Sequence, residues 1–109
     1  MGYIIQLLYP KHFTTYPNFM LYERMRIYGR VQKVLFRDSA RTRGNKLGLK
    51  GFVRNREDGS VEIYAAGNKE QIEKLFQWAA SGPPFASVKN CERDSCELPL
   101  VCDRFYLVL

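Results

Sequence analysis

The sequence is poor in the side chain that carries most acid–base catalysis. It contains a single histidine in 109 residues, His12, near the beginning of the chain. Ser–His–Asp and Cys–His sites need a histidine within hydrogen-bonding reach of the nucleophile. No such constellation can be assembled around the central motifs of this chain. A reaction that depends on strong general acid catalysis is therefore disfavoured.

Cysteine is also scarce. The three cysteines, Cys91, Cys96 and Cys102, are odd in number and lack the C-x-x-C spacing of paired metal ligands. No secretory signal is recognisable, so this usage favours free thiols in a reducing cytosol over a disulfide framework or a zinc site. We therefore expect a cytoplasmic protein with one or two buried thiols and with no metal or other cofactor.

Long hydrophobic runs are absent as well. The apolar run YIIQLLY (Tyr3–Tyr9) is far shorter than the roughly 20 residues that a membrane-spanning helix requires. It also lacks the basic region and the cleavage site of a signal peptide. We expect no membrane contact. We interpret residues 1–21 as an extension that is loosely ordered or packs on an apolar patch, and residues 22–109 as one domain.

Acidic residues are in the minority. Eleven Asp and Glu stand against 17 Lys and Arg, which gives a net charge of +6 at pH 7. This excess favours an anionic partner, whether a phosphorylated metabolite, nucleic acid or an anionic surface, without choosing among them. Hydrophobic residues at 46% and charged residues at 26% are ordinary globular values, which argues against wholesale disorder.

From Tyr22 onward, the spacing of apolar residues predicts alternating strands and helices. Period-two alternation indicates strands, the i, i+3, i+4 spacing indicates helices, and the Asp58-Gly59 turn indicates a hairpin. Asn68 and Gln71 have the spacing of a capping box. The expected order is strand 25–31, helix 36–47, strand 51–55, strand 60–66, a helix between Asn68 and Gly82, strand 85–90, a polar loop, and a short edge strand 105–108.

This order indicates an α+β fold. Two split βαβ units make a ferredoxin-like α/β sandwich, in which an antiparallel sheet carries both helices on one face. The last strand adds a short edge to that sheet. No internal repeat interrupts the pattern, and we expect one compact domain.

The stretch GRVQKVLFR, from Gly29 to Arg37, combines a glycine, apolar residues and three cations where the first strand turns into the first helix. A helix N-terminus presents unpaired N–H groups, so a bent loop there can form a phosphate-sized anion site. We expect Val31, Val34 and Phe36 to pin the loop to the core. Arg37 offers a planar fork of donors that matches phosphate oxygens. These residues alone also leave open a solvated connection that binds nothing.

The same stretch resembles the acylphosphatase signature G-x-V-Q-G-V-x-F-R. Farther along, LGLKGFVRNREDGSVEIYAAG is similar to the family's second motif, LGLxGWVxNxxDGxVEhxAxG, and SGPPFASV is similar to its GPP-x-A-x-V passage. The three matches occur in the family's order and cover about Met25–Val88. The resemblance implies the ferredoxin-like fold and the hydrolysis of small acyl phosphates to a carboxylate and inorganic phosphate.

The resemblance also implies roles for single residues. The arginine that ends the first motif, here Arg37, binds the phosphoryl group in that family, and the asparagine of the second motif, here Asn55, positions the attacking water. Shaping the hairpin is the alternative role for Asn55. With Arg37, the resemblance carries across a phosphate cradle made by the backbone of Arg30, Val31, Gln32, Lys33 and Val34. Because a carboxylate leaves without a proton, neutralising charge and aligning water suffice, and no metal is called for.

Lys33 departs from the family's motif, which has a glycine in the middle of the loop. If this position requires a positive φ, a β-carbon costs on the order of 1 kcal/mol. A misaimed amide at an oxyanion-type site costs about a hundredfold in rate. We therefore expect Lys33 to reduce activity, unless its ammonium group partners the phosphate and compensates.

Two other classes of function stay open. A non-catalytic member of the same fold would bind a phosphate, a carbamoyl-phosphate-like ligand or a partner protein. An RNA-binding module of this topology would stack bases on aromatics along the central strands, but the strand SVEIYAA offers only Tyr64, the first strand offers only Tyr28, and the cations do not follow them. We expect a monomer whose partner is a small-molecule acyl phosphate, and neither nucleic acid nor a membrane.

Overall fold

The computed structural model describes residues 20–97 and 102–109. Most of the predicted extension, residues 1–21, lies outside the described residues. The elements are, in chain order, β1 (Leu21–Arg30), α2 (Phe36–Lys46), β2 (Lys50–Asn55), β3 (Val61–Gly67), α3 (Lys69–Ala79), β4 (Ser87–Ser95) and β5 (Phe105–Val108).

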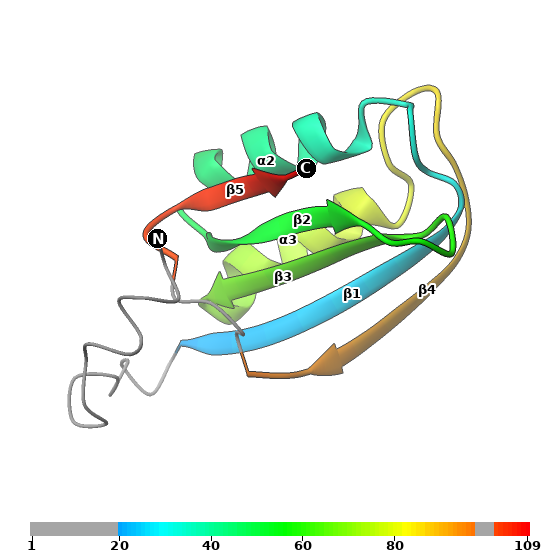
Figure 1. Cartoon of the computed structure of the whole chain (residues 1–109). Helices are drawn as coiled ribbons and strands as arrows, with labels where there is room; N and C mark the ends of the chain where they lie inside the picture. The colour runs from blue at the N-terminus through cyan, green and yellow to red at the C-terminus, as the bar shows by residue number, and fades with distance from the viewer. Residues whose placement is uncertain (1–19, 98–101) are drawn as a thin grey trace.

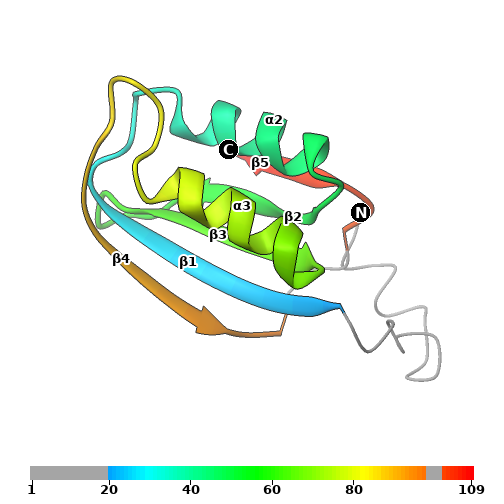
Figure 2. The ribbon, with the colours of Figure 1, turned by 180° about the vertical axis from the view of Figure 1, so that it is seen from behind.

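The five strands form one sheet in the order β4-β1-β3-β2-β5. Both helices cover the same face of it (Figures 1 and 2), with α2 beside β2 and β5 and with α3 beside β1 and β3. The predicted ferredoxin-like sandwich is confirmed, and the last strand is an edge strand as expected. The sheet is mixed, however, because β5 pairs in parallel with β2. The chain leaves β4 and enters β5 at the same end of the sheet, which gives β5 the direction of β2.

The hydrophobic core lies between the sheet and the two helices. Alternation along β1 directs Met25 and Ile27 into this core, where they are 5% and 0% exposed. The helices contribute Phe36, Ala40, Ile72, Leu75, Phe76 and Ala79. The predicted capping box is present, because Asn68 and Gln71 each bond the backbone N–H of the other. Neither described helix, at 11 residues each, is long and apolar enough to cross a membrane.

The opposite face of the sheet carries a small hydrophobic cluster of Phe52, Tyr64, Ala66 and Cys102 beside a set of tightly paired charged side chains. Glu62 is 0% exposed on β3 and accepts hydrogen bonds from Arg26 at 2.7 Å and from Arg54 at 2.8 Å. Burial raises the pKa of Glu62, but the two guanidinium groups outweigh this effect and leave the pKa below its ordinary value. This carboxylate therefore cross-links three neighbouring strands.

The strand predicted to end at Asn90 continues to Ser95, so the prediction of a polar loop for residues 91–95 is wrong. These residues show no apolar alternation because their stability comes from pairing with β1. Arg93 bonds Glu23 at 2.7 Å, and Arg24 bonds Asp94 at 3.1 Å. Charged side chains are compatible with an edge strand, and they also protect its free edge.

Candidate active site

The loop between β1 and α2, residues 31–35, is sharply bent. Lys33 and Leu35 have φ of 61° and 64°, and they are the only non-glycine residues with positive φ in the described parts of the chain. Val31 and Phe36, on either side of the bend, are 0% and 2% exposed, and Val34 packs against the same core. The prediction that these apolar residues hold the loop against the core is confirmed.

In the described parts of the chain, the N–H groups of residues 32–38, in this loop and in the first turn of α2, have no hydrogen-bond acceptor. Leu35 is the N-cap of α2 and has no side chain that could cap it. The first N–H here with a backbone acceptor is that of Ser39, which donates to the Leu35 carbonyl at 3.1 Å. Among the described residues, no carbonyl accepts a hydrogen bond from the N–H groups of residues 32–38. Unpaired N–H groups at the positive end of a helix dipole favour an anion.

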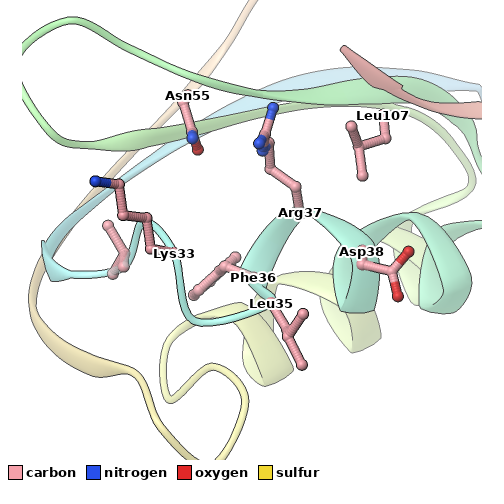
Figure 3. Close-up of a pocket in the computed structure, with 8 residues that line it drawn as sticks. Lys33, Leu35, Phe36, Arg37, Asp38, Asn55 and Leu107 are labelled. Atoms are coloured by element: carbon pink, nitrogen blue, oxygen red, sulfur yellow. The ribbon is translucent and has the colours of Figure 1, made fainter. Parts of the chain in front are cut away.

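A pocket of about 240 Å³ opens beside this loop. Figure 3 shows Arg37 and Asn55 reaching toward one another from α2 and β2, whereas the Lys33 ammonium group points to the side opposite Arg37. The two residues that the resemblance names as catalytic therefore face one space. The residues that line the pocket are Val31, Lys33, Leu35, Phe36, Arg37, Asp38, Asn55 and Leu107.

Arg37 projects from the first turn of α2. Its Nη1 donates a hydrogen bond to the Val108 carbonyl of β5 at 2.9 Å. The neighbouring acid Asp38 does not neutralise Arg37, because it forms its ion pair with Arg41. A guanidinium group has five N–H donors in a rigid fork. Most of those donors remain for an anion in the pocket.

Asn55 ends β2, opposite Val61 of β3. Its Oδ1 is buried and has no hydrogen-bond partner among the described residues. A buried acceptor without a donor costs about 1–3 kcal/mol. A water molecule in the pocket can supply the missing donor.

Gln32 ties the loop to the turn that follows Asn55. Its Nε2 donates to the carbonyls of Arg56 at 2.8 Å and Ser60 at 3.0 Å. The turn is itself held by Asp58, which accepts hydrogen bonds from the hydroxyl and the N–H of Ser60. These hydrogen bonds lower the pKa of Asp58. The loop and the end of β2 therefore form one rigid unit.

The side chains of four predicted site residues, Val31, Lys33, Arg37 and Asn55, line the pocket. Arg30, Gln32 and Val34 are predicted to contribute backbone groups, and their side chains lie elsewhere. Arg30 is exposed at the end of β1, the Gln32 side chain donates a hydrogen bond to the turn that follows Asn55, and Val34 packs on the core. The sequence reasoning missed Leu107, which lies in β5. Nothing in the short apolar run FYLV indicates that Leu107 faces a loop whose residues, 31–35, lie far earlier in the chain.

The described residues include no group of three or more His, Cys, Asp or Glu that could hold a metal ion. None of the three cysteines forms a disulfide with another described residue, and Cys102 is buried whereas Cys91 and Cys96 are half-buried. Burial raises the pKa of all three. They are therefore mainly protonated at neutral pH, and none has the depressed pKa of a reactive cysteine.

The chain is similar to known proteins of one family. A family model described as Acylphosphatase matches residues 23–106. The chain is 50% identical over 68 residues to an acylphosphatase of Azoarcus sp. (strain BH72), and the match covers 62% of this chain and 69% of that protein.

Solved structures agree. The fold is similar to that of an acylphosphatase from Coxiella burnetii, with a TM-score of 0.79 and 30% identity over 87% of this chain and 99% of the other. It is also similar to that of the acylphosphatase from Bacillus subtilis, with a TM-score of 0.76 and 32% identity over 82% of this chain and 99% of the other. With the first two of its three motifs meeting in one pocket and a family model matching residues 23–106, this chain belongs to the acylphosphatase family.

Proposed function

We propose that this protein hydrolyses small acyl phosphates to a carboxylate and inorganic phosphate in the pocket between the β1–α2 loop and the end of β2. Membership of the acylphosphatase family supports this reaction class. The pocket supports it independently, because it combines a cation, unpaired N–H groups and a polar side chain that can hold water. It accepts a phosphoryl group on one side and water on the other.

The phosphoryl group is held by the N–H groups of the loop and by Arg37. Phosphoryl transfer passes through a loose transition state in which negative charge is spread over the equatorial oxygens. Donors that are fixed before the reaction stabilise that charge without reorganising. The burial of Val31 and Phe36 at the two ends of the loop provides this rigidity.

The observation that carries the proposal is the buried, unpartnered Oδ1 of Asn55. In the proposed reaction, this oxygen accepts a hydrogen bond from the attacking water and holds it toward the phosphorus. The side chain faces Arg37 across the pocket, so the water and the phosphoryl group meet between them (Figure 3). Positioning of this kind converts a collision into a reaction between aligned partners.

The leaving group explains why such a sparse set of side chains suffices. An acyl phosphate releases a carboxylate, which is stable without a proton at neutral pH, so no general acid is required. Arg37 and the loop amides neutralise charge, and Asn55 aligns water. The reaction therefore needs no residue beyond those at this pocket.

The experiment is hydrolysis of acetyl phosphate and benzoyl phosphate by the wild type and by Asn55→Ala and Arg37→Ala variants. We expect Asn55→Ala to lower kcat by about a hundredfold with little change in inhibition by inorganic phosphate. We expect Arg37→Ala to weaken inhibition by phosphate by about tenfold or more, because a charge-assisted hydrogen bond is lost. Asn90→Ala, an exposed asparagine on β4, is the control.

Equal rates for the wild type and Asn55→Ala would instead favour the second candidate, a non-catalytic domain that binds phosphate. Lys33 is the observation that favours this candidate, because it places a β-carbon where the family motif has glycine. RNA binding has less support. Tyr64 is 8% exposed and its ring stacks on Phe52, so it presents no free face to a base.

A further inference from the structure

Strand β5 is held against helix α2 at two places. Near the end of α2, the Asn45 side chain donates from Nδ2 to the Phe105 carbonyl at 3.0 Å and accepts at Oδ1 from the Phe105 N–H at 2.8 Å. At the start of α2, Arg37 donates to the Val108 carbonyl at 2.9 Å. The helix advances about 12 Å between these two side chains, and the strand about 10 Å between its two contact points. The two contacts therefore lie along one shared edge.

Asn45 supplies to β5 what a neighbouring strand would supply. One side of this four-residue strand pairs with β2, and on the other side the Asn45 amide reproduces the N–H and C=O pattern of a strand. Short edge strands have little stability of their own. Phe105 is also 1% exposed and packs on Gly44, where a β-carbon would lie 2.5 Å from its ring. The end of β5 at Phe105 is therefore fixed on the helix.

The other end of β5 reaches the pocket. Leu107 forms part of the pocket wall, and the Val108 carbonyl takes one N–H of the Arg37 guanidinium group. A long arginine side chain has many rotamers, and a fixed acceptor selects one of them before a ligand arrives. Because the guanidinium group is planar and rigid, fixing one N–H also directs the others.

We propose that Asn45 is a positioning residue for phosphate binding, acting through β5 on the guanidinium group of Arg37. It touches neither substrate nor water. By fixing Phe105, it fixes the place of the Val108 carbonyl, and this carbonyl holds the Arg37 fork toward Asn55. The inference rests on the proposed function, because it takes Arg37 as the residue that binds the phosphoryl group.

The test is a double-mutant cycle read by the dissociation constant of inorganic phosphate, measured by phosphorus NMR titration. We expect Asn45→Ala to raise this constant about fivefold to tenfold, less than the loss of a whole charge-assisted hydrogen bond, because the guanidinium group is displaced but not removed. We expect kcat for acetyl phosphate to fall less than about threefold, because the water held by Asn55 is unaffected. In an Arg37→Ala background, Asn45→Ala should change phosphate affinity by less than about twofold.

Two further variants separate positioning from stability. Gln71→Ala removes two hydrogen bonds between a side chain and the backbone, the one donated to the Leu47 carbonyl at 2.8 Å and the one accepted from the Asn68 N–H at 2.9 Å, and neither involves β5. It should leave phosphate affinity unchanged. Asn45→Asp keeps an acceptor for the Phe105 N–H but sets a second carboxylate oxygen against the Phe105 carbonyl, so it should give a loss at least as large as that of Asn45→Ala. If Asn45→Ala does not fold, Asn45→Asp carries the same comparison.

Each result has a definite meaning. An equal loss of affinity from Asn45→Ala with and without Arg37 would show that Asn45 acts through the fold as a whole, and the inference would be overturned. Unchanged affinity in Asn45→Ala, with a wild type that still hydrolyses acyl phosphates, would overturn this inference alone. A wild type that neither binds phosphate nor hydrolyses acyl phosphates would overturn the proposed function, and this inference with it.

Discussion

Replacing Lys33 by glycine tests whether the β1–α2 loop stores strain. The φ of Lys33 is 61°, in the left-handed region where a β-carbon approaches the backbone. The sequence predicts that a β-carbon at this position destabilises the loop if φ is positive, and φ is positive here. The side chain is exposed and forms no ion pair with another described residue, so its removal forfeits little packing.

The expected magnitude follows from two opposing terms. Left-handed backbone costs an L-residue roughly 1–2 kcal/mol, and this cost disappears with glycine. Glycine also has more conformational freedom than lysine in the unfolded chain, and this lowers the free energy of unfolding by about 0.5–1 kcal/mol. We therefore expect Lys33→Gly to be more stable than the wild type by about 0.5–1 kcal/mol. This corresponds to a rise in Tm of about 4 °C for a domain of this size.

Two control variants isolate the backbone. Lys33→Met removes the ammonium group and keeps the β-carbon, so its stability should stay within about 0.5 kcal/mol of the wild type. Glu57→Gly introduces glycine at an exposed turn residue without a positive φ, and we expect it to be destabilising. Urea unfolding can be followed by the fluorescence of Trp78, which lies 5.3 Å from the Phe36 ring between centroids. A Lys33→Gly variant less stable than the wild type would refute the strain argument.

The same variants decide how Lys33 affects the reaction. If the lysine impairs the loop, Lys33→Gly hydrolyses acetyl phosphate faster than the wild type, and we expect a rise of several-fold because the amides are better aimed. A Lys33→Gly variant that is no faster refutes this expectation. If the ammonium group instead compensates by binding phosphate, Lys33→Met is slower than the wild type and binds inorganic phosphate more weakly.

Two further predictions concern stability away from the pocket. Gly44→Ala places a β-carbon 2.5 Å from the Phe105 ring, and we expect a net loss of about 1–2 kcal/mol in urea unfolding because overpacking exceeds the gain of about 1 kcal/mol in helix propensity. Higher stability in this variant would contradict the packing seen here. Glu62→Gln should cost about 2 kcal/mol at pH 7, because two guanidinium groups lose their carboxylate. The folded pKa of Glu62 is lowered, so its contribution is present above the ordinary glutamate pKa of about 4.3 and is lost as pH falls through the folded pKa. The difference between the two proteins should therefore shrink below about pH 4, and a difference that stays constant down to acid unfolding would refute this assignment.

The sequence by itself determined the order of the helices and strands, the capping box of α3 and the bend before α2. Each of these depends on residues close together in the chain: alternation in β1, the Asn68–Gln71 pair, and apolar residues on both sides of the bend. The sequence also named Arg37 and Asn55 as candidate site residues, because each stands in a motif that can be recognised without knowing what lies beside it in space.

Only the tertiary structure decided what depends on distant partners. The strand residues 91–95 and the buried position of Glu62 follow from ion pairs across strands, which leave no periodic signal in the chain. The contacts of β5 with Asn45 and Arg37 join residues 60 and 71 positions apart. Local patterns record which side chains are apolar or charged, whereas the direction of a guanidinium group depends on the carbonyl that the fold places beside it.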